Sequence, residues 1–328
     1  MPNKIPLLSR DREGVVTYST RRGSALLTVL WLTAALAAIG LAVANNVRGE
    51  TERAATNVDD TRAYFLARGA IERAILRMQW GPDFYTRGAP TMDLPFPDGQ
   101  VRVEIIPETA KLNPNFARPE ELLRLLIALG VPEDRASGIT AAIMDWRTPD
   151  DPLHTSPFDQ FYLAQSPSFL PRHASFQENE ELLLVNGITP DLFYGTSIDN
   201  SRAGLRDCVS VFGGGGAVDI NTARLETFVA VGIDPVDAAA IVQNRAQHPV
   251  LDYTELASIQ QSLGPSGVHL TLGGQTMFTL RATARMRQPD GRLSDLRRTV
   301  AALIKFNYPG NRQGKPPGVE VVRWYDRA

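Results

Sequence analysis

Four aspartates crowd one short stretch of the sequence, and they are the residues best suited to chemistry. They are Asp145, Asp150, Asp151 and Asp159, in the segment DWRTPDDPLHTSPFDQFY. Carboxylate oxygens are the ligands that Ca²⁺ takes from such loops, roughly six to eight at a time. The spacing is not that of an EF-hand, and a loop rich in carboxylates is also commonly a solvated turn. A calcium site and a solvated loop are both open interpretations at this point.

The other reactive side chains do not form a recognisable catalytic set. The histidines share no metal-ligand spacing and are expected in loops or at the surface; they are His154, His173, His248 and His269. The single cysteine, Cys208, excludes an internal disulfide and a zinc site built on paired thiolates. Its apolar neighbours predict a small core residue. We therefore predict no active site and no enzymatic activity.

Charge is distributed unevenly along the chain. Residues 1–23 have a net charge of +3, which leaves −5 for the rest of a chain whose total is −2. Nucleic-acid binding needs concentrated Lys and Arg, so we expect no nucleic-acid partner. The glycine run at 213–216 lacks the Lys-Ser/Thr pair of a phosphate loop and predicts a flexible linker.

The elements that position these residues begin with a long helix. Ser24 to Ala44 is a run of 21 residues without a charge, long enough to span a bilayer as a helix. Arg21 and Arg22 precede it, which predicts a cytoplasmic N-terminus. The helical pattern then continues to Gln79 without a proline, and Gly81-Pro82 predicts its end. An ordinary secretory signal cut near Ala44 is the alternative, but its apolar stretch would be shorter.

Strands are predicted at both ends of the remaining chain. Residues 100–109 alternate apolar and charged side chains, as a half-buried strand does. Residues 276–287 and 293–306 predict two more strands around the turn at 288–291, and 319–324 predicts a last one. A long helix with an antiparallel sheet predicts an α+β fold.

A helical insert is predicted between these strands, with an internal repeat. Three copies of one pattern run from an amphipathic helix through a glycine to a proline: 122–132, 181–190 and 225–235. The glycine suits a left-handed C-cap, and the proline suits the start of the next helix. Asn113 and Asn221 precede the first and third copies, and Arg147 and Arg245 close them. The insert is therefore expected to be built of helical hairpins.

Arg21-Arg22-Gly23 before Ser24 and the apolar run resembles the processing site of type IV prepilins and type II secretion pseudopilins. The resemblance implies cleavage between Gly23 and Ser24 by a prepilin peptidase, with the helix kept on the mature protein. Most pilins carry Glu at the fifth mature position, which here is Thr28. The lack of this Glu, the insert and the segments KLNPN, VDINTA and EELLLVNG resemble the minor pseudopilin K family.

That resemblance implies a single-pass inner-membrane protein with a periplasmic head at the tip of a type II secretion pseudopilus. It also implies three kinds of partner: minor pseudopilins of the I and J kinds, the inner-membrane secretion platform and the prepilin peptidase. Calcium in the insert is implied too, although the family's Gly-Ala-Glu-like continuation is replaced by Ser156-Pro157-Phe158. A minor pilin of a type IV pilus and a signal-anchored periplasmic binding or enzymatic domain are the alternatives.

We thus expect five consecutive regions. They are a leader (1–23), a transmembrane helix (24–44), the helix continuation with the first strands (45–112), a helical insert (113–273) and the remaining strands (274–328).

Overall fold

The computed structural model describes residues 24–81, 83–86, 88–149, 156–195, 203–214, 216–274, 276–307 and 317–326. These residues confirm the predicted α+β class: a long helix, a five-stranded antiparallel sheet, and a run of short helices between two of its strands. The chain divides into two compact units, residues 1–59 and 60–328.

Helix α1 runs without a break over Ser24–Trp80, as predicted. Its apolar first part is exposed on all sides, with Leu26 at 77% and Trp31 at 72%. Among the described residues, it is the one helix long and apolar enough to cross a membrane. So much exposed apolar surface indicates that lipid or other helices cover it. Gly81, with φ of +97°, follows the last turn.

In the second unit, the last turns of α1 pack on the sheet. The helix presents small side chains, which let its backbone approach the strands closely; Ala63, Ala67, Ala70 and Ala74 are fully buried. They meet the inward side chains of the strands, among them Val101, Val103 and Ile105. This helix-on-sheet contact forms one of the two hydrophobic cores.

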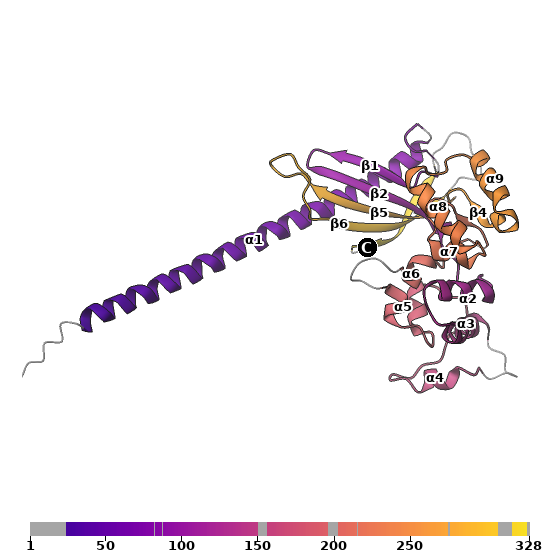
Figure 1. Ribbon diagram of the computed structural model, residues 1–328, viewed down its shortest axis with the longest axis horizontal. Helices are drawn as coiled ribbons and strands as arrows, with labels where there is room; N and C mark the ends of the chain where they lie inside the picture. The colour runs from indigo at the N-terminus through magenta and orange to yellow at the C-terminus, as the bar shows by residue number, and fades with distance from the viewer. Residues whose placement is uncertain are drawn as a thin grey trace, which may run out of the picture. The chain divides into compact units, whose positions relative to one another are not determined.

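Five strands form the sheet, and all neighbours in it are antiparallel (Figure 1). In spatial order they are β1 (Thr91–Phe96), β2 (Gly99–Pro107), β5 (Met277–Met286), β6 (Arg298–Asn307) and β7 (Gly318–Tyr325). The predicted strands are confirmed, although β6 begins five residues later than expected. Strand β1 was not predicted, because it is short and contains Pro95.

The helical insert connects β2 to β5. Its elements are η1 (Glu108–Ala110), α2 (Pro119–Ala128), α3 (Glu133–Arg147), α4 (Asp159–Leu163), η2 (Asn179–Leu184), α5 (Pro190–Tyr194), α6 (Leu205–Cys208), β3 (Val218–Asp219), α7 (Leu225–Ala230), α8 (Pro235–Gln247), α9 (Tyr253–Ser262), η3 (Gly264–His269) and β4 (Leu270–Thr271). The amphipathic α-helix expected at 181–185 is instead the 3₁₀ segment η2. Strands β3 and β4 pair in parallel.

The insert has its own hydrophobic core. Its largest fully buried side chains include Trp146, Tyr162, Phe193 and Phe228. Helix α2 packs on both α3 and α7, so the first and third predicted hairpins share one interior. Cys208 is fully buried in this core, as predicted, and burial raises the pKa of its thiol to about 12.

Candidate functional site

Two of the four clustered aspartates lie beside one histidine. Asp145 is in the last turn of α3, and Asp159 is the first residue of α4. His173 Nδ1 lies 3.3 Å from the backbone carbonyl oxygen of Asp145. Its Nε2 lies 3.4 Å from Asp159 Oδ1. The end of α3, the start of α4 and the loop at His173 therefore lie together in the fold.

The two carboxylates keep spare capacity to bind a cation. Asp145 Oδ2 is a buried atom without a hydrogen-bond partner among the described residues. Asp159 Oδ1 is also buried and makes no hydrogen bond there, but it lies 3.4 Å from His173 Nε2. A buried carboxylate oxygen without a donor is costly, and a cation removes that cost. Burial raises the pKa of the Tyr162 hydroxyl, and the charges of Asp145 and Asp159 add to that rise. Both carboxylates therefore lie close enough to Tyr162 to influence the pKa of its hydroxyl.

An aromatic cluster holds the ends of α3 and α4 in place. Trp146, 1% exposed, stacks on Phe176 with ring centroids 6.0 Å apart. Tyr162 meets Trp146 edge-on at 5.6 Å, and Phe169 lies against both rings. Because Trp146 follows Asp145 and Tyr162 belongs to α4, this packing sets the positions of both carboxylates.

The predicted ligand set is thus described only in part. Asp150 and Asp151 lie outside the described residues, as does His154. No group of three or more His, Cys, Asp or Glu side chains suited to a metal occurs in the part of the chain that the structure describes. His173 lies in a loop, as one of the two predicted placements has it, but its side chain is only 10% exposed, so it is not a surface histidine. Its burial depends on contacts with α3 and α4 that sequence spacing does not reveal.

The repeated asparagines of the insert have the same structural role. Asn221 is buried; its Nδ2 donates to the carbonyl oxygens of Gly88 (2.8 Å) and Val250 (2.6 Å), and its Oδ1 accepts from the Val250 amide. Asn113 Nδ2 likewise donates to the carbonyl oxygens of Val211 and Gly213. Each asparagine joins the start of a hairpin to a distant loop, so these residues are structural.

The repeated arginines close the same two hairpins. Arg147 donates to the carbonyl oxygens of Pro114 and Ala117, and Arg245 donates to that of Ile220. The glycine run was expected to be a flexible linker, but Gly213 is closely packed: a Cβ there would lie 2.8 Å from the Lys111 carbonyl oxygen. That expectation is wrong at Gly213.

The predicted processing and tip-specific residues lie at the start of the chain. Gly23 lies outside the described residues, and Ser24 is the first residue of α1. Thr28 is exposed on the helix, and its hydroxyl donates to the carbonyl oxygen of Ala25 at 2.8 Å. Thr33, one and a half turns further along, makes the same bond to Leu30 at 2.9 Å. The polar group at position 28 is therefore satisfied within its own helix.

Comparisons with known proteins bear on the helical insert in particular. Residues 107–195, which include α2, α3 and the Asp145–Asp159 region, match the family model described as type II secretion system (T2SS), protein K. The type II secretion system protein K of Klebsiella pneumoniae is 27% identical over 198 residues, which are 53% of this chain and 60% of that relative. The match spans less than two thirds of the relative's length.

A solved structure is also similar: the GspK–GspI–GspJ complex of the type 2 secretion system from enterotoxigenic Escherichia coli, with 18% identity and a TM-score of 0.48. That likeness covers 83% of this chain and 98% of the solved one. The resemblance expected from the sequence is confirmed by the family model and the Klebsiella relative: this chain is similar to protein K of type II secretion systems.

Proposed function

We propose that this chain is a minor pseudopilin that caps the tip of a type II secretion pseudopilus and supports its assembly. The family match over residues 107–195 carries this proposal. The exposed apolar part of α1 supports it, because such a helix requires a bilayer or a bundle of similar helices around it. In this proposal residues 24–44 span the inner membrane, the N-terminus is cytoplasmic and the head is periplasmic.

Thr28 supports the tip position. An interior subunit needs a carboxylate at this position to neutralise the amino terminus of its neighbour, because an unpaired charge in an apolar core costs several kcal/mol. Thr28 offers a hydroxyl, and that hydroxyl already bonds to Ala25. The subunit can still present its own Ser24 amine to the glutamate of another subunit. The subunit is therefore suited to the tip of the filament, where partner subunits lie on the membrane side of it and no subunit lies beyond it.

Substituting glutamate at position 28 tests this polarity. Full-length protein co-expressed with its I-kind and J-kind partners should co-purify with them and occur once per filament by immunogold counting. Thr28→Glu should raise that count severalfold and spread the label along the filament, because it supplies the missing carboxylate. Thr33→Glu is the matched control, since Thr33 makes the same hydrogen bond within the same apolar segment.

The control should produce no such spread, because its carboxylate has no amine to meet. Regular labelling of filaments by the unaltered protein would show that the tip assignment is wrong. A failure to co-purify with pseudopilins, with partners from a type IV pilus bound in their place, would favour the alternative assignment to that pilus.

Calcium binding by the acidic region is a further part of this proposal. Two buried carboxylate oxygens support it, because oxygen ligands in a loop suit this ion. Among the described residues neither Asp145 Oδ2 nor Asp159 Oδ1 makes a hydrogen bond, and Asp159 Oδ1 forms the longer, 3.4 Å ion pair with His173. Asp150 and Asp151 are the other proposed ligands. A bound cation would neutralise the repulsion among the four carboxylates and hold the ends of α3 and α4 together.

Calcium is therefore expected to raise the melting temperature of the full-length protein in detergent by several degrees relative to EDTA. Binding to the folded state alone contributes about 2.7 kcal/mol when the ion is at a hundred times its Kd. Asp159→Asn, and separately the double change Asp150→Ala with Asp151→Ala, should abolish the calcium-dependent shift. Asp290→Asn, in an exposed turn outside the insert, should keep it. Melting curves that superimpose with and without calcium would refute the site.

A further inference from the structure

A pocket of about 590 Å³ lies between the sheet and the insert, and neither Asp145 nor Asp159 lines it. Its walls come from strands β1, β2, β5, β6 and β7 and from the insert elements η1, η2, α6, α7 and α8. Five basic side chains line it: Lys111, Arg206, Arg224, Arg245 and Arg281. Four acidic side chains line it as well, which leaves an excess of one positive charge.

The basic groups in this pocket are incompletely paired. Arg281 lies 3.6 Å from Glu104, Lys111 3.6 Å from Glu108, and Arg224 3.9 Å from Asp207. All three separations exceed the usual range of a hydrogen bond, about 2.7–3.2 Å. Elsewhere the same protein forms short charged hydrogen bonds: Arg102 Nε lies 2.9 Å from Asp93, and Arg118 Nη2 lies 2.7 Å from Glu121.

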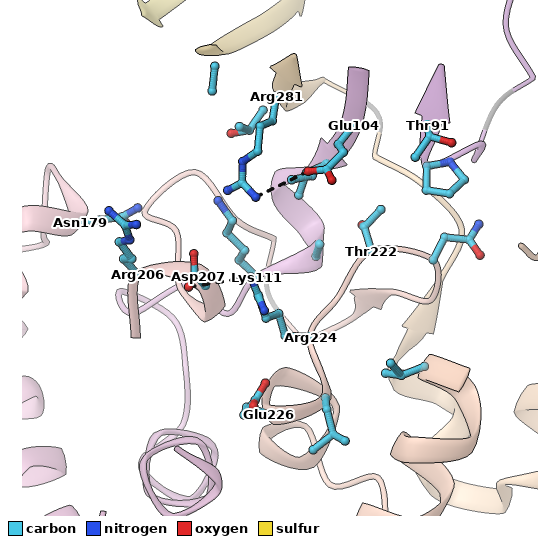
Figure 2. A pocket seen from close by; sticks show the side chains of 18 of the residues that line it. Thr91, Glu104, Lys111, Asn179, Arg206, Asp207, Thr222, Arg224, Glu226 and Arg281 are labelled. Carbon is cyan, nitrogen blue, oxygen red and sulfur yellow. Dashed lines mark ion pairs between the residues drawn. The ribbon is translucent and has the colours of Figure 1, made fainter. Parts of the chain in front are cut away.

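Basic groups also face one another across this space. Figure 2 shows the side-chain ends of Lys111 and Arg281 pointing toward each other, with the Arg281–Glu104 ion pair beside them. Within the described part of the chain, no hydrogen bond is formed by the side-chain nitrogens of Lys111, Arg206, Arg224 and Arg281, although the Arg206 guanidinium lies over the Tyr194 ring at 5.2 Å. Arg281 Nε is a buried atom without a hydrogen-bond partner among the described residues. Lys111 is only 16% exposed. Lys111 and Arg281 Nε are thus held away from water and are expected to have an acceptor, whereas the side chains of Arg206 and Arg224 are exposed.

The arginine on α8 adds to this concentration of positive charge. Burial lowers the pKa of Arg245 to about 10; the charge of Asp219 opposes that decrease, and the nearby charge of Arg224 adds to it by a smaller amount. Arg245 is thus still protonated at neutral pH while another guanidinium lies close to it. An anion between them would relieve this repulsion.

The geometry points to this pocket as a binding site for a small organic oxyanion, a molecule that carries phosphate or carboxylate groups. Guanidinium forks bind both groups through paired N–H donors, and a lysine adds a compact charge. The volume exceeds that of a single phosphate and lies within the range of roughly 300–1,000 Å³ found for small-molecule sites. Such a ligand would contact Arg281 on the sheet and Lys111, Arg206 and Arg224 on the insert side.

The test uses titration calorimetry on the full-length protein in detergent, without added calcium and at constant ionic strength. Inorganic phosphate and succinate are the two probes, and they distinguish phosphate from carboxylate chemistry. At least one should bind saturably at one site per chain. Arg206→Gln and Arg224→Gln should each weaken that binding at least tenfold, whereas Arg292→Gln, an exposed arginine in the turn before β6, should leave it unchanged.

Lys111 is left intact because its removal would leave the carboxylate of Glu108, 3% exposed, buried without its cation. Circular dichroism of each variant separates lost binding from lost folding. Heats no larger than those of sodium chloride for both probes would overturn the proposal. Equal weakening by Arg292→Gln would overturn it too, because it would show general charge attraction. This site does not depend on the pseudopilin assignment, so either proposal can fail alone.

Discussion

Gly23→Leu is expected to leave the leader on the protein, so that essentially no chain beginning at Ser24 is found in membrane fractions. A small residue lets the backbone enter a protease cleft at the membrane edge, and a leucine side chain would block that approach. Helix α1 begins at Ser24 and carries the apolar run directly after Gly23. Mass spectrometry of the N-terminal peptide measures the outcome.

Gly40→Leu is the matched control for this change. Gly40 lies in the same apolar helix, and a Cβ at that position meets nothing within 4 Å. This variant should be processed as the unaltered chain is, with Ser24 at its N-terminus. An unaltered protein that keeps Met1, or that begins near Asn45, would contradict processing at Gly23 and would favour an uncut anchor or an ordinary secretory signal.

Trp146→Ala is expected to destabilise the insert by about 3–5 kcal/mol, the usual cost of removing a large buried aromatic side chain. The indole stacks on Phe176 and meets Tyr162 and Phe169, so its removal leaves a cavity lined by three rings. Urea denaturation of the full-length protein in detergent, followed by tryptophan fluorescence and circular dichroism, measures the change. Any calcium-dependent shift in melting temperature should be lost as well, because Asp145 and Asp159 depend on this packing.

Trp80→Ala provides the comparison. Trp80 is 60% exposed at the end of α1 and contacts Phe84 at its ring edge. Its removal should change the free energy of unfolding by no more than about 0.5 kcal/mol. If both substitutions had the same small effect, the aromatic cluster would not be what stabilises the insert.

The sequence was sufficient to predict the elements whose patterns are local. Helix α1 and the strands around residues 101, 280 and 321 follow from apolar periodicity. The left-handed turns at Gly130 and Gly232 follow from glycine between an apolar helix and a proline. Segment η2 was misread because EELLLV has the composition of an α-helix. In the fold, this segment ends after two short turns, where Val185 takes an extended conformation.

The sites were predictable only in part, because they depend on distant contacts. Asp145 and Asp159 were found from their density in the sequence, but His173 was missed, since only the packing of α3 and α4 places it between them. The pocket between sheet and insert was not found at all. Its basic residues come from separate elements, and no spacing along the chain connects Lys111 with Arg281.

Strands β2 and β5 pair directly with each other although the whole insert lies between them. Pro107 is opposite Phe278 in the register, so about 170 residues separate two neighbours in the sheet. Closing a flexible loop of that length costs about 3 kcal/mol more conformational entropy than closing a four-residue turn. An insert that folds first removes most of this cost, because its two ends then lie side by side. We therefore expect the insert to fold first and strands β2 and β5 to pair afterwards. The insert would then act as the turn of a hairpin does, by holding the two strand ends close together before they pair.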